Sequence, residues 1–278
     1  MSVYENFMSQ LSDKGALFNV RSEKLQTASG LLIPNKKVII NERSNDPIGI
    51  VSEGYKVVKN EEIFDGFCKS IEKSNINTDG AQINVSFAKG GAKTLVDFIF
   101  PEESFSVDGD SSKTALNIVA LNSFDGSTRY ITKAGGFRIK CMNGQVIGNI
   151  ASAYSSTHTN KLDVDAGAQR VINMLQEFQG AKHYWGKMLQ TPLTHVQAHK
   201  IIEEFIGKKV DFSERIPAMY DCVNRLWLAY AKEFGQNTYA LYNAMTDYVS
   251  HKESKTGCVK RISLEKRIVN TMPMLLGV

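Results

Sequence analysis

Residues 114–132 read Thr-Ala-Leu-Asn-Ile-Val-Ala-Leu-Asn-Ser-Phe-Asp-Gly-Ser-Thr-Arg-Tyr-Ile-Thr. Two runs rich in apolar and β-branched residues flank a short turn segment, and such runs favour β-strands. The dipeptide Asp125-Gly126 is typical of a tight hairpin turn, because glycine adopts positive φ angles without steric cost. This stretch therefore predicts an antiparallel β-hairpin.

Two further hairpins are predicted upstream of this one. Residues 83–88 and 94–100 flank a turn at 89–93, and residues 37–40 and 48–51 flank a turn at 44–47. The arms alternate between polar and apolar residues, as expected for strands with one buried face. A helix is predicted between these hairpins, over residues 60–74, because its apolar residues recur at helical spacing.

The periodicity becomes helical after about residue 164. Apolar residues then recur at intervals of three and four, which predicts at least three helices. The stripes are Ala168, Val171, Ile172, Leu175 and Phe178; Leu193, Val196, Ile201, Phe205 and Ile206; and Met219, Cys222, Val223, Leu226, Trp227 and Tyr230. Gly180, Gly207 and Gly235 are expected to end helices.

Strands followed by helices indicate an α+β protein, since a parallel sheet would require the two to alternate. We expect residues 1–163 to form a β-rich α+β half, in which an antiparallel hairpin sheet packs with helices. Residues 164–278 should form a mainly helical half. No low-complexity linker separates the halves, so we expect them to pack as one compact body.

The composition is that of an ordinary globular chain, with 278 residues, 42% hydrophobic, 22% charged and a net charge of +4. The apolar runs are far shorter than the ~20 residues a bilayer requires, so no membrane partner is expected. The N-terminus has no basic and apolar leader. The cysteines, Cys68, Cys141, Cys222 and Cys258, form no Cys-x-x-Cys pair and suggest reduced thiols. We therefore expect a cytoplasmic protein.

Common catalytic and cofactor-binding motifs are absent from the sequence. Residues 90–94 end like a phosphate-binding loop, but Ala92 separates the glycines from Lys93, and Ser86 stands where the leading glycine belongs. No Gly-x-Gly-x-x-Gly or Gly-x-Ser-x-Gly segment occurs. We expect no cofactor, and a glycine hairpin at residues 89–93.

A weak metal-site candidate consists of His195, His199 and Glu203. Their spacing of four places them on one face of a predicted helix, and two imidazoles with a carboxylate can bind zinc. A zinc protease of the His-Glu-x-x-His type would need glutamate at position 196, which is valine. A solvated polar helix face is the favoured interpretation, so no metal is expected.

The most informative segment runs from residue 126 to residue 162, because it contains no aspartate or glutamate. Arg129, Lys133, Arg138, Lys140 and Lys161 supply all of its Lys and Arg charges. Aromatic and hydrogen-bonding residues alternate with these cations, a mixture that suits a single nucleic-acid strand, since cations bind phosphates and flat rings stack on bases. The alternative remains that the aromatic residues are core and that the cations solubilise one sheet face.

Several segments together resemble the phage/plasmid-like family called domain of unknown function 932. They are Gly54-Tyr-Lys-Val-Val-Lys-Asn-Glu-Glu-Ile-Phe64, Asn122-Ser-Phe-Asp-Gly-Ser127, Arg138-Ile-Lys-Cys-Met-Asn-Gly144, His158-Thr159 and Asn243-Ala-Met-Thr246. The resemblance spans about residues 48–251. Phe124 departs from the histidine expected in the second segment. The resemblance implies a phage, prophage or plasmid origin and a bacterial cytoplasm, whereas the family name assigns no activity.

The order of hairpins and helices is also broadly similar to single-strand annealing proteins of the Rad52 and phage Redβ type, which form oligomers with a basic groove. We therefore expect a non-enzymatic protein that binds or anneals single-stranded DNA in phage or plasmid recombination or replication, as a homo-oligomer. The candidate DNA-binding residues are Lys89, Lys93, Arg129, Tyr130, Lys133, Phe137, Arg138, Lys140, Asn143, Tyr154, His158 and Lys161.

Two alternatives stay open. One is an enzyme acting on nucleic acid, with Asp125, Cys141, His158 or the metal-site candidate performing chemistry; Cys141 is attractive because Arg138 and Lys140 would favour its thiolate. The other is a host-interacting or anti-defence protein whose helices bind a host partner. Its support is the aromatic content of those helices, which at helical spacing more often marks core.

Overall fold

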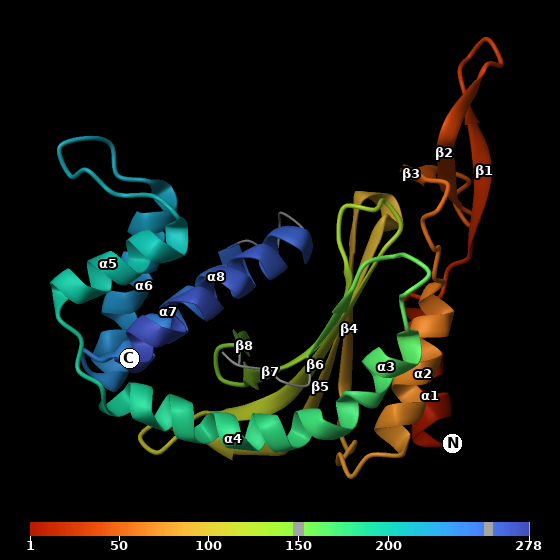
Figure 1. Cartoon of the computed structure of the whole chain (residues 1–278). Helices are drawn as coiled ribbons and strands as arrows, with labels where there is room; N and C mark the ends of the chain where they lie inside the picture. Colours follow the sequence, from red (N-terminus) through yellow and green to blue (C-terminus); the bar gives the residue numbers. More distant parts are fainter. Residues whose placement is uncertain (147–152, 253–257, 278) are drawn as a thin grey trace. The chain divides into compact units, whose positions relative to one another are not determined.

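The computed structural model describes residues 1–146, 153–252 and 258–277, and Figure 1 shows the course of the chain. The elements up to residue 106 are α1 (Val3–Asp13), β1 (Val20–Gln26), β2 (Leu32–Asn41), β3 (Pro47–Ser52), α2 (Asn60–Glu72), β4 (Gln82–Ala88), the 3₁₀ turn η1 (Lys89–Gly91) and β5 (Lys93–Ser106). The strands that follow are β6 (Lys113–Ser123), β7 (Tyr130–Arg138), β8 (Asn143–Val146) and β9 (Tyr154–Ser156). The chain then continues through α3 (Val164–Gln169), α4 (Val171–Gln190), α5 (His195–Ile206), α6 (Ala218–Phe234), α7 (Thr238–Asp247), the π-helical turn η2 (Tyr248–Lys252) and α8 (Cys258–Leu276). The predicted α+β class is confirmed.

The strands form two sheets. One contains β1, β2 and β3 in that order, and the other has the order β4-β5-β6-β7-β8 with β9 paired to β7. The predicted hairpins around residues 44–47 and 89–93 are antiparallel pairs, with Ile39 opposite Gly49 and Val85 opposite Val96. The stretch 114–132 supplies β6 and the start of β7, which are neighbours in the sheet. The hairpin prediction at residues 114–132 is thus confirmed.

The chain divides into two compact units that interleave in sequence. Unit 1 consists of Met1–Glu102, Ile118–Ala134 and Ser152–Leu175, and unit 2 consists of Glu103–Asn117, Gly135–Ala151 and Gln176–Val278. Strands β5, β6 and β7 and helix α4 each contribute residues to both units. The two compact units therefore do not correspond to two consecutive stretches of the sequence.

In unit 1, helices α1, α2 and α3 pack beside one another and α1 reaches β4. Phe98 on β5 is the centre of their core, with its ring centroid 6.0 Å from that of Phe7 and 5.2 Å from that of Phe67. All three side chains are almost fully buried. Burial of each such ring contributes about 1.5–3 kcal/mol, which fixes the helices on the sheet.

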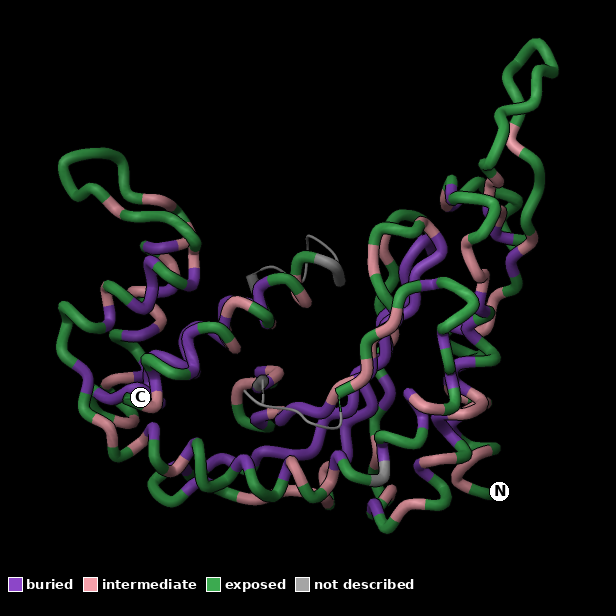
Figure 2. The backbone as a smooth tube through the Cα atoms, in the orientation of Figure 1, coloured by how far each residue is buried: buried purple, intermediate pink, exposed green. Residues whose placement is uncertain are grey.

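In unit 2, aromatic rings join the strand residues to α4 and α7. Phe105 packs against Phe178 at 4.8 Å and against Trp185 at 5.6 Å, and Trp185 lies 6.3 Å from Tyr242. Helices α5 to α8 pack around these, and Figure 2 shows buried residues along α7 and along the strands. The aromatic residues of this half therefore include much of its core.

Two of the three predicted helix ends are correct. Gly207 has the left-handed conformation that ends α5, and Gly235 follows the last residue of α6. Gly180, by contrast, lies inside α4, because the apolar stripe of that helix continues to Trp185 and outweighs the modest cost of one internal glycine. None of the described helices has the length and apolar composition needed to span a bilayer.

Candidate functional site

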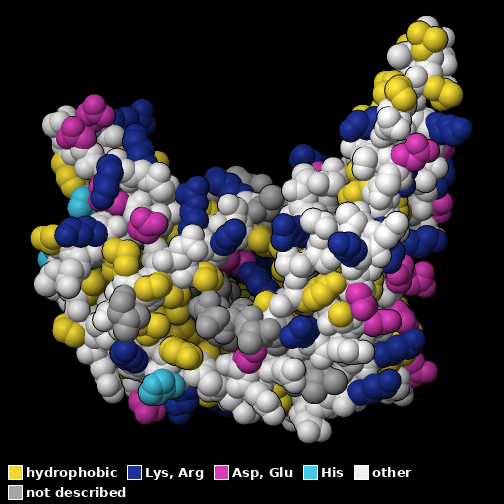
Figure 3. All heavy atoms as spheres, viewed as in Figure 1, with side chains coloured by type: hydrophobic (Ala, Val, Ile, Leu, Met, Phe, Trp, Pro, Cys, Tyr) yellow, Lys and Arg dark blue, Asp and Glu magenta, His cyan; other side chains and the backbone are white. Residues whose placement is uncertain are grey.

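The structure divides the predicted DNA-binding residues between the two units. Unit 1 holds Lys89, Lys93, Arg129, Tyr130, Lys133, Tyr154, His158 and Lys161, and unit 2 holds Phe137, Arg138, Lys140 and Asn143. On the face shown in Figure 3, Lys and Arg side chains stand among Asp and Glu side chains over both units.

In unit 2, Arg138 is fully buried and fully engaged. Its Nε and Nη2 atoms donate to the two carboxylate oxygens of Asp110, both at 2.7 Å, and its Nη1 atom lies 2.7 Å from the Cys141 Sγ atom. Burial opposes the charge, but the bonds with Asp110 outweigh it and raise the pKa of Arg138. Tyr239 also donates to Asp110, at 2.9 Å. Arg138 therefore stabilises unit 2, and its guanidinium is not available to bind an external phosphate.

The other predicted DNA-binding residues of unit 2 are also hydrogen-bonded within the protein or partly buried. The exposed Lys140 donates to Glu233 at 2.7 Å, and the buried Asn143 donates to the hydroxyl of Tyr230 at 2.9 Å. Phe137 is half-buried. The segment turns at Met142, whose φ angle is 54°, and β8 pairs back onto β7. The Arg-x-x-Cys-x-Asn segment is thus a packed turn.

Unit 1 contains an ordered turn at residues 122–127. The Asp125 carboxylate accepts hydrogen bonds from the hydroxyls of Ser123 and Ser127, at 2.9 and 2.7 Å, and pairs with Lys93 Nζ at 3.1 Å. Burial would raise the pKa of Asp125, but the bonds from Ser127, Ser123 and Lys93 lower it to about 2. Because Lys93 is buried, this pair fixes the turn onto β5.

A stacked pair of rings lies beside this turn. The ring centroids of Tyr55 and His158 are 4.8 Å apart with an interplanar angle of 16°, and the Tyr55 hydroxyl donates to the carbonyl of Ser123 at 2.6 Å. His158 is only 4% exposed, and neither of its ring nitrogens has a hydrogen-bond partner among the residues that the structure describes. Burial lowers the pKa of His158. Burial therefore disfavours the charged form of this ring, whose nitrogens keep unused hydrogen-bonding capacity.

These residues border a polar cavity of about 370 Å³, which we call the His158 pocket. Its lining is rich in hydroxyl groups and glycine, includes one cation and contains no carboxylate. The lining residues are Ser52, Gly54, Tyr55, Gly126, Ser127, Thr128, Arg129, Thr157, His158 and Thr159. Gly126 has a φ angle of 69°. Three segments of the family resemblance, at 54–64, 122–127 and 158–159, therefore meet at one cavity.

The remaining predicted residues of unit 1 differ in exposure. Arg129 and Lys161 are exposed, and Arg129 forms no ion pair with any described residue. Lys89 is exposed but lies 3.6 Å from Asp125. Tyr130 is completely buried, with its ring edge-on to that of Tyr154 at 5.8 Å, so Tyr130 has no free face for a base. Tyr154 and Lys133 are half-buried.

The metal-site candidate lies on α5, but its groups have other partners. The Glu203 carboxylate accepts from the backbone nitrogen of Val210 at 2.7 Å and from Lys209 at 3.1 Å. His199 Nδ1 lies 3.0 Å from the Tyr220 hydroxyl, and the His195 ring packs against Trp227. Among the residues with described positions, no group of three or more His, Cys, Asp or Glu side chains could hold a metal ion.

Tyr55 and the hydroxyls around it were not among the predicted binding residues. The sequence did contain a signal for Tyr55, because Gly54 and Tyr55 are the first two residues of the first segment of the family resemblance. Phe124, the departure from the expected histidine, is buried in a core cluster with Val20, Ile39 and Val51. Position 124 thus serves packing in this chain, and the imidazole at the pocket comes from His158.

Comparison with known proteins gives one family match. No curated protein and no solved structure matches the chain significantly. The family described as "Domain of unknown function (DUF932)" matches residues 47–270, which include both the His158 pocket and the Arg138 network. Since that match covers most of the 278 residues, the chain belongs to the DUF932 family.

Proposed function

We propose that this protein binds single-stranded DNA through unit 1, with one backbone phosphate held in the His158 pocket. The observation that carries the proposal is the pocket itself, where the described residues bring together hydroxyl groups, an arginine that has no ion pair with any of them, and a buried histidine whose ring nitrogens bond to none of them, with no carboxylate in the lining that they form. The pocket also draws on the acid-free segment 126–162. The buried Lys93, Tyr130, Arg138 and Asn143 are left out of the proposed interface.

The charges around the pocket favour an anion. The Arg129 guanidinium can donate two parallel hydrogen bonds to a phosphate. Two carboxylates adjoin lining residues in sequence: the exposed Glu53, between Ser52 and Gly54, and Asp125, which is engaged by Lys93, Ser123 and Ser127 and so repels an incoming phosphate less than a free carboxylate would. Lys161 stands exposed two residues beyond the lining residue Thr159. A phosphate in the pocket therefore meets the charge of Arg129 close to that of Lys161, while the charge of Asp125 is already neutralised by Lys93.

The buried ring of His158 gives a second reason to expect a ligand, one that does not depend on charge. Buried polar side-chain atoms almost always have a hydrogen-bond partner, because an unpaired one costs about 1–3 kcal/mol. Both ring nitrogens of His158 lack a partner. A neutral imidazole carries one N–H donor, which a phosphate oxygen can accept. A bound phosphate would satisfy this group once the His158 ring turns toward the cavity, because neither ring nitrogen is exposed in the free protein.

The size of the cavity favours a flexible strand. A volume of about 370 Å³ lies in the range of small-ligand pockets. A single strand can turn one phosphate and its sugar into such a pocket, whereas a regular duplex would have to deform to do so, at an energetic cost. The proposed activity is binding, and no covalent step is part of it.

The test is fluorescence anisotropy of a labelled oligonucleotide with wild-type protein and Arg129→Ala over a series of salt concentrations. Each phosphate neutralised on a single strand contributes about 0.7 to the logarithmic salt slope. We expect Arg129→Ala to lower the slope by about this amount. The matched control is Arg225→Ala, because Arg225 on α6 is exposed and forms an ion pair with the exposed Asp221 at 3.1 Å.

Two results would contradict the proposal. One is absence of binding by the wild-type protein at low salt. The other is an equal salt slope for wild type, Arg129→Ala and Arg225→Ala, which would place the bound strand away from the His158 pocket.

A further inference from the structure

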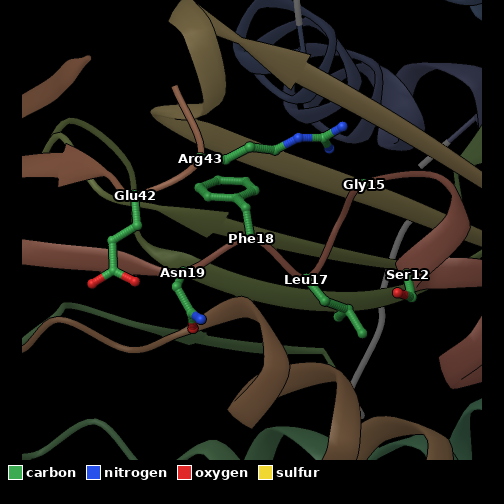
Figure 4. Close-up of a pocket in the computed structure, with 7 residues that line it drawn as sticks. All are labelled: Ser12, Gly15, Leu17, Phe18, Asn19, Glu42 and Arg43. Carbon is green, nitrogen blue, oxygen red and sulfur yellow. The ribbon is translucent and has the colours of Figure 1, made fainter. Parts of the chain in front are cut away.

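Unit 1 contains a second cavity, of about 390 Å³, which we call the Phe18 cavity. It is lined by Ser12, Gly15, Leu17, Phe18, Asn19, Glu42 and Arg43. Figure 4 shows these residues, which come from the last turn of α1, from the segment that follows α1 and from the two positions directly after β2. None of them was expected to function from the sequence, and the family match begins after them, at residue 47.

The cavity has an aromatic wall that continues onto the surface. Phe18 is half-buried, and its ring lies edge-on to that of Phe87 at 6.2 Å. Phe87, on β4, is 42% exposed. Gly91 lies close to the same ring, since a Cβ atom there would stand 3.1 Å from Phe18 Cζ. The chain thus keeps two neighbouring phenyl rings accessible at one place, although large aromatic residues are usually buried.

Polar groups surround this wall. Figure 4 shows the Arg43 side chain extending beside the Phe18 ring and the Glu42 carboxylate pointing away from that ring. Arg43 is exposed and forms no ion pair in the described portion of the structure. Asn19 and Ser12 add an amide and a hydroxyl. An aromatic face with donors and acceptors at its edge matches a nucleobase, which has a π-face and polar edges.

We infer that the Phe18 cavity binds an unpaired nucleobase, stacked on Phe18 and Phe87, of the strand whose phosphate occupies the His158 pocket. This inference rests on the proposed function and names the part of the ligand that the second cavity takes. One turn serves both sites, because Phe124 packs against Phe18 at 5.7 Å while Gly126 to Arg129 line the His158 pocket. A strand held at one site is therefore brought close to the other.

The charge of the neighbouring residues favours a nucleic acid over an apolar partner. Lys89 directly follows β4, is 71% exposed and shares its carboxylate partner, Asp125, with the closer Lys93. Arg43 adds a cation that can also stack on a base. A purely apolar partner would leave both cations without a role, whereas a strand supplies a phosphate with each base.

The test compares a normal labelled oligonucleotide with one of the same length that lacks its bases, using wild type, Phe18→Leu and Phe87→Ser. Leucine at position 18 keeps much of the core volume, and Phe87→Ser changes a surface residue, so the second variant remains informative if the first does not fold. We expect wild type to bind the normal strand about fivefold or more tightly than the abasic strand, and each variant to lose most of that preference. Phe212→Ala is the matched control, because Phe212 is a 58% exposed aromatic residue of unit 2.

The outcomes separate this inference from the proposed function. Equal binding of both strands by wild type, with weakening by Arg129→Ala, would overturn base stacking at Phe18 and leave phosphate binding intact. Loss of base preference in Phe212→Ala but not in Phe18→Leu or Phe87→Ser would also overturn the inference. Absence of binding to either strand would overturn both proposals.

Discussion

Arg129 and Arg138 lie nine positions apart in the same acid-free segment, yet the structure treats them in opposite ways. Arg138 is fully buried in unit 2, where Asp110 accepts two of its hydrogen bonds. Arg129 is exposed in unit 1, at a cavity with no acidic lining. A basic segment in sequence therefore contains both a structural cation and a candidate binding cation, and the position of carboxylates from elsewhere in the chain distinguishes them.

The difference between the two arginines comes from the turn before β6, which places the Asp110 carboxylate beside Arg138. Asp110 follows Gly109, whose φ angle of 97° lets the chain turn, and donors from Ser112, Tyr239 and Arg138 all converge on its carboxylate. In unit 1 the corresponding acid is Asp125, but its partners are Lys93 and Lys89. Arg129 is thus exposed and has no ion pair among the described residues.

The largest expected effect is on the buried pair of unit 2. Asp110→Asn leaves the buried Arg138 guanidinium with only the more distant carboxylate of Glu233, at 3.3 Å, as a countercharge, which should lower the free energy of unfolding by about 3–5 kcal/mol. Chemical denaturation of the wild type and the variant measures this change in the free energy of unfolding. Asp108→Asn is the control, because the Asp108 side chain is 97% exposed and lies 3.8 Å from Lys182. A loss below about 1 kcal/mol for Asp110→Asn would mean that Arg138 does not stabilise unit 2 through this pair.

A smaller loss is expected at the turn of unit 1. Asp125→Asn removes the countercharge of Lys93, whose side chain is 3% exposed, and should cost roughly 2–3 kcal/mol because the carboxylate itself retains some contact with water. The pKa of Asp125 is lowered to about 2, so its contribution is complete above its ordinary pKa and is lost as the pH falls towards 2. Unfolding free energies of wild type and variant should therefore converge in acid. A constant difference between about pH 5 and pH 2 would contradict this assignment.

A pH effect on affinity tests His158. Burial lowers the pKa of this ring, whereas a bound phosphate would favour the imidazolium. Affinity for an oligonucleotide should therefore increase as the pH falls from about 8 to about 6, by at most about tenfold per pH unit. His158→Gln should bind with little pH dependence. Wild-type affinity that is flat over this range would exclude a phosphate next to the ring.

The smallest expected effect completes the contrast between the arginines. Arg129→Ala should change the free energy of unfolding by no more than about 0.5 kcal/mol, as for most surface substitutions. Thermal or chemical unfolding of Arg129→Ala beside Arg138→Ala provides the comparison. If the two variants were destabilised equally, Arg129 would have a structural role and the distinction between the two arginines would be lost.

Sequence patterns recover most of the secondary structure. The apolar alternation around residues 89–93 predicts the β4–β5 pair, and the stripe through Trp227 predicts α6. Gly180 was misassigned because a local turn preference is weaker than the packing of a long amphipathic helix. The interleaving of the two units is not visible in sequence, because it depends on which residues contact one another across β5, β6 and β7.

The sequence by itself determined the α+β class, the hairpins, the DUF932 resemblance and the position of the acid-free segment. These features rest on local periodicity, turn chemistry and composition, all of which are readable along the chain. The tertiary structure decided which cations are paired, that His158 is buried without partners, and that Tyr55, Gly126 and His158 share one cavity. Burial and pairing depend on contacts between residues distant in sequence, so only the folded chain could separate the structural residues from the candidate ligand-binding ones.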